Sequence, residues 1–214
     1  MPVKVKICGL TRPEDAARAA ATGASYLGVV FAGGPRHVTV DQAARIATAG
    51  GSTPTFGVYG DQTVEEILRI SDRAGLAGAQ LHGTYGRDVA TTLRAHGLRV
   101  WRVVRIAGRE HMDLLEEAIH DSDAVHVEPM VAHARGGAGV PLDLSLAREA
   151  RTRLAGHMMV LAGGLTPVSV VGAAALVRPE VVDVSSGVEG LPGEKDPEKI
   201  ARFMEAVFAH SAIS

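Results

Sequence analysis

Short apolar runs rich in valine, isoleucine and leucine recur along the whole chain. Their hydrophobic residues are nearly continuous, which predicts strands buried on both faces, as in a parallel sheet covered by helices. The eight runs read VKVKICG from Val3, YLGVVF from Tyr26, TFGVYG from Thr55, GAQLHG from Gly78, RVWRVVRI from Arg99, AVHVEP from Ala124, MMVLAGG from Met158 and VVDVSSG from Val181.

The stretches between these runs have the spacing of amphipathic helices, among them residues 12–21, 64–74 and 114–120. Helix-start signals support this register. Thr11 with Glu14, and Thr63 with Glu66, have the spacing of a capping box. Asp196 precedes a proline suited to a first helical turn. Strands that alternate with helices predict repeated right-handed βαβ units.

Eight strand–helix units fit a closed (β/α)8 TIM barrel or, as the less favoured alternative, an open wound sheet. At 214 residues the chain has a length at which such a barrel forms one domain. Neither a linker nor a low-complexity segment interrupts the series. We therefore predict an α/β protein with a single (β/α)8 barrel domain over residues 1–214.

Composition and charge narrow the function classes. The chain is 46% hydrophobic and 21% charged, as expected of a soluble protein with a sizeable core. Its net charge of −2 gives no reason to expect nucleic acid or a membrane as partner, and no apolar run has the length of a membrane span. A single cysteine favours a reducing compartment, and the first residues lack the pattern of a secretory signal. We therefore predict a cytoplasmic protein.

In a barrel of this class the active site lies at the carboxyl ends of the strands. The polar and glycine-rich residues of this chain are expected to gather there. They are Cys8-Gly9, 33–36, His82-Gly83, Arg102, Arg105, Glu128, Gly163-Gly164 and 183–187.

Two glycine-bearing turns follow the last two expected strands, at Gly163-Gly164 and at Ser185-Ser186-Gly187. Glycines allow backbone N–H groups to approach an anion, and serines add hydroxyl donors. Either turn alone is adequately explained by tight strand-to-helix geometry. In barrels, however, the loops after strands seven and eight commonly bind phosphate, so the pair predicts a phosphate site.

Cys8 and Glu128 are the candidate base and acid. A lone cysteine beside a strand is more often a small buried hydrophobe, and a thiol becomes a useful base only where its surroundings favour the thiolate. A carboxylate that ends an apolar strand is either ion-paired at the rim or, with a raised pKa, a general acid. Both readings stay open on the pattern alone.

Three other polar residues are candidates for binding roles. Arg36 has a guanidinium suited to gripping a carboxylate bidentately, although a loop arginine is usually only solvated. His82 and Arg105 are candidates that would equally well satisfy hydrogen bonds at the rim. Neither metal-ligand spacing nor a nucleotide-binding glycine motif is present, so we expect no metal and no cofactor.

Taken together, these motifs resemble the phosphoribosylanthranilate isomerase family of tryptophan biosynthesis. The resemblance runs over essentially the whole chain. It rests on KICGLTRPEDA at the start, the FAGGPRHV loop, QLHG, LAGGLTP and DVSSGVEGLPGEKDPEKI. The first and last segments in combination are highly specific.

The resemblance implies an Amadori rearrangement of N-(5′-phosphoribosyl)anthranilate by general acid–base catalysis without a cofactor, in a monomer or homodimer. It implies that Cys8 is the base and that Arg36 holds the anthranilate carboxylate. The two glycine-bearing turns would hold the phosphate. Asp183 would be a nearby polar contact to the substrate, as would His82.

The chain also departs from the family pattern. Glu128 stands where the family usually has aspartate, Ala138 where we expect threonine, and Leu144 where an aromatic residue is usual. Two alternatives therefore stay open: a related aminoaldose-phosphate isomerase with altered substrate range, and a catalytically silent barrel that binds a phosphorylated ligand. Cys8 argues against the first, and Cys8 together with Arg36 argues against the second.

Overall fold

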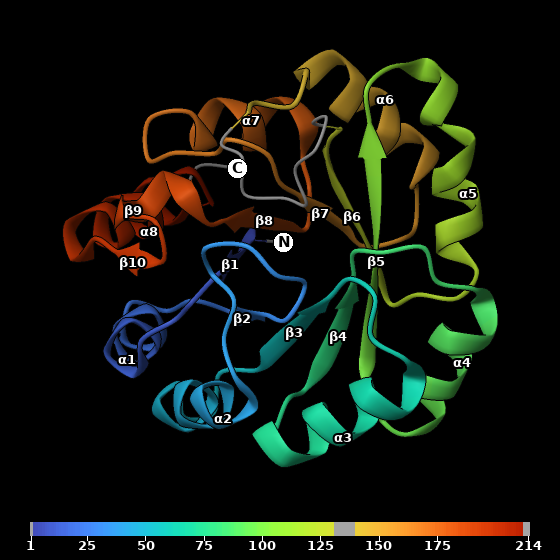
Figure 1. Cartoon of the computed structure of the whole chain (residues 1–214). Helices are drawn as coiled ribbons and strands as arrows, with labels where there is room; N and C mark the ends of the chain where they lie inside the picture. The colour runs from blue at the N-terminus through green and yellow to red at the C-terminus, as the bar shows by residue number, and fades with distance from the viewer. Residues whose placement is uncertain (1, 131–139, 212–214) are drawn as a thin grey trace.

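The protein is a closed barrel of eight parallel strands surrounded by helices, as Figure 1 shows. The computed structural model describes residues 2–130 and 140–211. All eight expected strands are confirmed, and they follow one another around the barrel in chain order. They are β1 Lys4–Ile7, β2 Tyr26–Val30, β3 Thr55–Tyr59, β4 Gly78–Leu81, β5 Arg99–Ile106, β6 Ala124–Pro129, β7 Met159–Leu161 and β8 Val181–Val184. Pairing of β1 with β8 closes the barrel.

Helices connect successive strands and cover the outside of the barrel (Figure 1). They are α1 Pro13–Ala21, α2 Val40–Ala49, α3 Val64–Ala74, α4 Arg87–Ala95, α5 Asp113–Ile119, α6 Leu144–Arg153, α7 Val170–Val177 and α8 Pro197–Ser211. Short 3-10 helices lie at η1 Arg109–His111 and η2 Ser186–Val188. A small antiparallel pair, β9 Glu189–Leu191 and β10 Glu194–Lys195, precedes α8 and was not expected from the sequence. No helix within the described ranges has both the length and the apolarity to cross a bilayer.

The helix-start expectations have mixed outcomes. Thr63 and Glu66 form the expected capping box of α3, and the Asp196 carboxylate accepts hydrogen bonds from the first backbone amides of α8. The capping box expected at Thr11 is wrong. Its hydroxyl donates instead to the carbonyl of Gly193, because the β9–β10 hairpin lies against the start of α1.

The interior of the barrel is layered because alternate residues of each strand point inward. At the amino ends of the strands an apolar plug fills the interior, with Phe56 and Trp101 fully or almost fully buried. The plug consists of Tyr26, Phe56, Trp101, Ala124, Val160 and Val181. One step toward the carboxyl ends, the inward residues of four strands are polar and buried: Lys6, Gln80, His126 and Asp183. The apolar floor therefore supports a charged layer, and the barrel mouth lies above it.

Candidate active site

Two of the predicted site residues meet directly at the mouth of the barrel. The Nε2 atom of His82, which follows β4, lies 2.7 Å from Oε1 of Glu128 near the end of β6. Arg105 of β5 is the register partner of Glu128, and its Nε donates to the same oxygen at 3.0 Å. Both His82 and Glu128 are buried. The expected cluster at the carboxyl ends is therefore present for these residues.

The hydrogen bonds of Arg105 also assign the tautomer of His82. An arginine has only donors, so its Nη2, 2.7 Å from Nδ1 of His82, requires an unprotonated Nδ1. The imidazole proton then lies on Nε2 and is donated to Glu128. His82 is thereby a donor that fixes the Glu128 carboxylate in place.

Arg102 does not belong to this cluster, so that part of the expectation is wrong. Its Nη1 lies 3.1 Å from Oδ2 of Asp121, in the turn before β6. Adjacent residues of a strand point to opposite faces, and Arg102 is an odd number of positions from Arg105. The sequence showed that both arginines lie in the same strand, but it did not show that they point to opposite faces of the sheet.

Of the two readings left open for Glu128, the structure shows the ion-paired one. Burial acts to raise the pKa of its carboxyl group, but hydrogen bonds from His82 and Arg105 outweigh burial and lower it to about 2. Glu128 is therefore an anion at neutral pH. A role as acid requires that substrate binding return a proton to it.

This lowered pKa predicts an acid-labile fold. The carboxyl groups of Glu128 and Asp183 each have a pKa of about 2, below their ordinary values of 4.5 and 3.8, so the unfolded chain takes up protons first as pH falls. Their stabilising contribution is present above the ordinary values and is lost progressively down to about pH 2. We expect the free energy of unfolding to fall by a few kcal/mol over that window. Urea titrations followed by the fluorescence of Trp101 measure it, and a constant free energy between pH 5 and 2.5 would contradict the two pKa values.

Cys8 follows β1 at the mouth and is a free, buried cysteine. Burial raises the pKa of its thiol, and the nearby ammonium of Lys6 opposes that rise. The substrate-free protein therefore holds Cys8 as a thiol at neutral pH. Its surroundings include a cation that favours the thiolate, which is the condition that a cysteine base requires.

Asp183 lies inside β8 and not at its end as the sequence suggested, and it belongs to the charged layer beneath the mouth. Its Oδ2 accepts hydrogen bonds from Nζ of Lys6 at 3.0 Å and from Nε2 of His126 at 2.8 Å. Its Oδ1 is buried and has no hydrogen-bond partner among the described residues.

Arg36 extends from the loop after β2 and is ion-paired, not solvated. Its Nε and Nη2 lie 2.7 Å from the two carboxylate oxygens of Glu189, which in turn accepts a bond from Nζ of Lys195 at 2.8 Å. This arrangement occupies the Nε side of the guanidinium. An incoming carboxylate would therefore meet the opposite edge, formed by Nη1 and Nη2.

The loops after β7 and β8 lie against each other, as a shared phosphate site requires. A side chain at Gly187 would begin 1.8 Å from the carbonyl oxygen of Leu165, so only glycine permits this approach. The loop after β1 joins them, since a side chain at Gly9 would collide with Ser185 and Arg36. Gly163, Gly164 and Ser186 lie within these loops.

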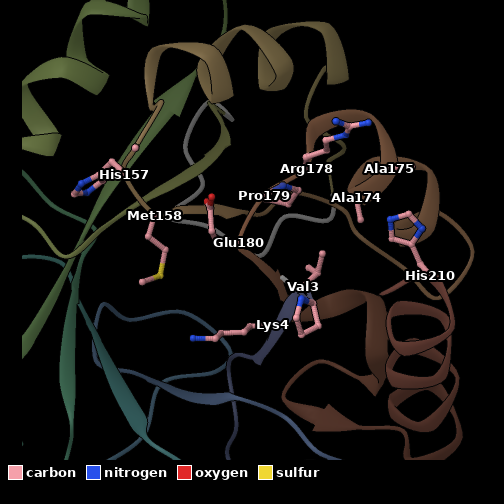
Figure 2. Close-up of a pocket in the computed structure, with 12 residues that line it drawn as sticks. Val3, Lys4, His157, Met158, Ala174, Ala175, Arg178, Pro179, Glu180 and His210 are labelled. Atoms are coloured by element: carbon pink, nitrogen blue, oxygen red, sulfur yellow. The ribbon is translucent and has the colours of Figure 1, made fainter. Parts of the chain in front are cut away.

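A separate cavity of about 1030 Å³, whose lining residues Figure 2 shows, lies at the amino ends of the strands. It is lined by residues at the amino ends of strands, including Lys4 of β1, Met158 before β7 and Glu180 before β8. Catalytic groups of such barrels come from the carboxyl ends. Its lining contains neither the Cys8 nor the Glu128 cluster, and we do not assign it to the active site.

Sequence reasoning missed four residues that contact the predicted site residues: Lys6, His126, Glu189 and Lys195. A signal existed for Lys6, which interrupts the apolar run between Val5 and Ile7 and is fully buried. A buried lysine is costly unless it is paired, so it marks a specific interaction. Glu189 and Lys195 gave no comparable signal, because their pairing depends on the β9–β10 hairpin. Ala138 lies outside the described residues, and Leu144 is the first residue of α6.

The part of the chain that the structure describes holds no group of three or more His, Cys, Asp or Glu side chains arranged for a metal ion. The groups available in and beneath the mouth are the Cys8 thiol, the carboxylates of Glu128 and Asp183, the imidazole of His82 and fixed cations. Such a set is suited to moving protons on an anionic substrate.

Comparison with known proteins gives consistent results. A family model described as N-(5′-phosphoribosyl)anthranilate (PRA) isomerase matches residues 5–206. N-(5′-phosphoribosyl)anthranilate isomerase of Trichlorobacter lovleyi is 38% identical over 207 residues, covering 94% of this chain and 96% of that protein. Phosphoribosyl anthranilate isomerase of Thermotoga maritima has a TM-score of 0.87 at 31% identity, covering 97% of this chain and 99% of that one. A solved complex of such an isomerase with reduced 1-(o-carboxyphenylamino)-1-deoxyribulose 5-phosphate has a TM-score of 0.85 at 30% identity, over 97% and 99% of the two chains.

Proposed function

The chain belongs to the N-(5′-phosphoribosyl)anthranilate isomerase family, and we propose that it rearranges N-(5′-phosphoribosyl)anthranilate with Cys8 as base and Glu128 as acid. The reaction belongs to tryptophan biosynthesis. The observation that carries the assignment of residues is the convergence of Cys8, the Glu128–His82–Arg105 cluster and the two glycine-bearing loops on one barrel mouth.

The two anionic ends of the substrate have separate places in this proposal. The phosphate lies against the loops of Gly163-Gly164 and Ser185–Gly187, whose amides and hydroxyls serve as donors. The anthranilate carboxylate lies on the Nη1–Nη2 edge of Arg36, which Glu189 holds in a fixed orientation. Asp183, in the charged layer beneath the mouth, is a nearby polar group on the ribose side. The reacting ribose is thereby held between Cys8 and Glu128.

The reaction then consists of proton movements. Glu128 gives a proton to the ribose ring oxygen, and the bond between that oxygen and the first carbon breaks as the nitrogen lone pair forms a Schiff base. Cys8 removes the proton from the second carbon, and the electron pair moves into the enolamine. Tautomerisation of the enolamine gives the 2-ketone. Each transfer is of the kind that a positioned acid or base typically accelerates 10²- to 10⁴-fold.

The protonation states of the free protein impose a condition on this scheme. At neutral pH, Cys8 and Glu128 together hold one proton, and this proton lies on the Cys8 thiol. The reaction needs the proton on Glu128. A bound substrate brings phosphate and carboxylate charges and excludes water, and both effects favour the neutral form of Glu128 and of Cys8. At Cys8 the cations of Lys6 and Lys195 oppose these effects, so the rise in pKa is larger at Glu128. We therefore propose that substrate binding moves the equilibrium toward thiolate and carboxylic acid.

A pH dependence follows. The free protein must hold one proton in the pair to become active, so kcat/KM should be level through neutral pH and fall about tenfold per pH unit above the thiol pKa. That pKa is raised above its ordinary 9.0, so the fall belongs to strongly alkaline solution. Steady-state rates above pH 7 measure it, where the substrate phosphate is already dianionic. A rise of kcat/KM as the thiol ionises would contradict the one-proton requirement.

The substrate assignment has its own test, which compares kcat/KM for phosphoribosylanthranilate with that for an aminoaldose phosphate lacking the aromatic carboxylate. A preference of at least about 10²-fold is expected from the carboxylate contact with Arg36. Equal values would remove Arg36 from recognition. We further propose a cytoplasmic enzyme that needs no cofactor and exists as a monomer or homodimer; its Thermotoga maritima relative is described as dimeric, with monomers generated from it.

A further inference from the structure

A buried lysine lies directly beneath the candidate base. Lys6 is two positions before Cys8 on β1, so both side chains point into the barrel, and Lys6 is 0% exposed. Gly28 of β2 faces both of them. A side chain at Gly28 would begin 2.8 Å from Sγ of Cys8 and 3.1 Å from Cε of Lys6, so the thiol and the end of the lysine side chain lie against the same spot.

The position of the Lys6 ammonium is fixed from three sides. Nζ donates to Oδ2 of Asp183 and to Oε1 of Gln80, both at 3.0 Å, and lies 5.8 Å from the centre of the Trp101 ring beneath it. Cys8, which follows β1, is the next inward residue after Lys6. An ammonium has three donors, and the two bonds to β8 and β4 leave one for the sulfur.

We propose that Lys6 is a positioning residue of the reaction, whose ammonium group stabilises Cys8 in its thiolate form and fixes the direction of the sulfur. The inference rests on the proposed function for its consequence in catalysis, but the interaction itself does not. Asp183 and Gln80 hold Lys6 in place, so the charged layer of the barrel acts on the base above it.

Other charged groups also face the thiol and set the sign of each expected change. Lys6 lowers the pKa of Cys8 by charge and by hydrogen bonding, Asp183 raises it, and Lys195 of β10 lowers it less. Arg36 is close enough for Cys8 to affect its pKa. Burial acts to lower the pKa of Lys6, but the charge of Asp183 outweighs burial and raises it, so Lys6 keeps its proton.

Two substitutions should therefore move the thiol in opposite directions. Lys6→Met removes the cation and should raise the pKa of Cys8 by about 1 to 3 units, while Asp183→Asn removes the anion and should lower it. Lys4→Met is the matched control, since it makes the same change on the same strand at the exposed amino end and should leave the thiol unchanged. A perturbation of packing alone would not give opposite signs.

The measurement uses the fact that the chain has one cysteine, so alkylation by iodoacetamide and the ultraviolet absorbance of the thiolate both report Cys8 alone. At about pH 8, Lys6→Met should alkylate at least about tenfold more slowly than the wild type, and Asp183→Asn faster. If Lys6→Met does not fold, Lys6→Gln makes the same loss of charge with a polar side chain and should also slow alkylation. Unchanged alkylation in a folded Lys6 variant would overturn the inference.

The consequence for catalysis is measured separately. Lys6→Met should lower kcat/KM about tenfold for each unit by which the thiol pKa rises, and should move the alkaline fall of kcat/KM to higher pH by the same amount. Wild-type protein that titrates as described but does not turn over phosphoribosylanthranilate would refute the proposed function and leave the Lys6–Cys8 interaction standing. Normal wild-type turnover with a thiol insensitive to Lys6 would do the reverse.

Discussion

Replacing Cys8 by serine is expected to reduce kcat roughly 10²- to 10⁴-fold. The hydroxyl group has nearly the size of the thiol but gives up its proton far less readily, so the fixed cation at Lys6 has no accessible anion to stabilise. The proposed substrate contacts at the glycine-bearing loops and at Arg36 do not involve the sulfur. The change should therefore appear in kcat, with little effect on binding.

Binding of a reduced product analogue to Cys8→Ser is the control. Its dissociation constant should stay within about threefold of the wild-type value, which corresponds to less than about 1 kcal/mol. Unchanged turnover in Cys8→Ser would remove Cys8 from the mechanism. Lost turnover together with lost analogue binding would indicate a damaged mouth, and the far-ultraviolet circular dichroism would then distinguish local from global damage.

Replacing Glu128 by glutamine is expected to have an effect of similar size, again roughly 10²- to 10⁴-fold in kcat. The amide keeps the shape and the contact distance to Nε2 of His82 but has no proton to give to the ring oxygen. It also leaves Arg105 without its anionic partner at 3.0 Å. Ring opening should become the slow step, and the substrate should accumulate bound and unopened.

Glu128→Asp is the matched variant, because it keeps the carboxyl group and shortens the side chain by about 1 Å. A displacement of that size can cost about 10²-fold in rate, so this variant should retain more activity than Glu128→Gln. Near-normal activity in the glutamine variant would require another acid. Asp183 is the first candidate, although its contacts with Lys6 and His126 keep its pKa at about 2 in the free protein.

The sequence predicted the fold because hydrophobic burial is a local and periodic signal. Each of the eight apolar runs became a strand of the barrel, and the alternation of strands with helices settled their parallel pairing. The failures have a common cause. The hydroxyl of Thr11 bonds to the carbonyl of Gly193 and does not cap α1, and Arg102 bonds to Asp121 and does not reach the mouth. Tertiary structure supplies both partners.

The candidate site was predictable in its residues but not in its electrostatics. Cys8, Arg36, Glu128 and the two glycine-bearing loops follow from motif and strand position. The pKa of Glu128 depends on His82 after β4 and on Arg105, its register partner on β5. No spacing along the chain reveals these contacts. The same holds for Arg36, whose partner Glu189 is 153 residues away.

The most direct test of the account is the isomerisation itself, followed as loss of anthranilate fluorescence when purified protein is added to freshly generated phosphoribosylanthranilate. The account predicts rapid loss in proportion to the protein added, with Cys8→Ser slower by about 10² or more under the same conditions. If the wild-type protein consumes no substrate while the reduced product analogue still binds, the barrel and its phosphate site stand but the assigned reaction is contradicted.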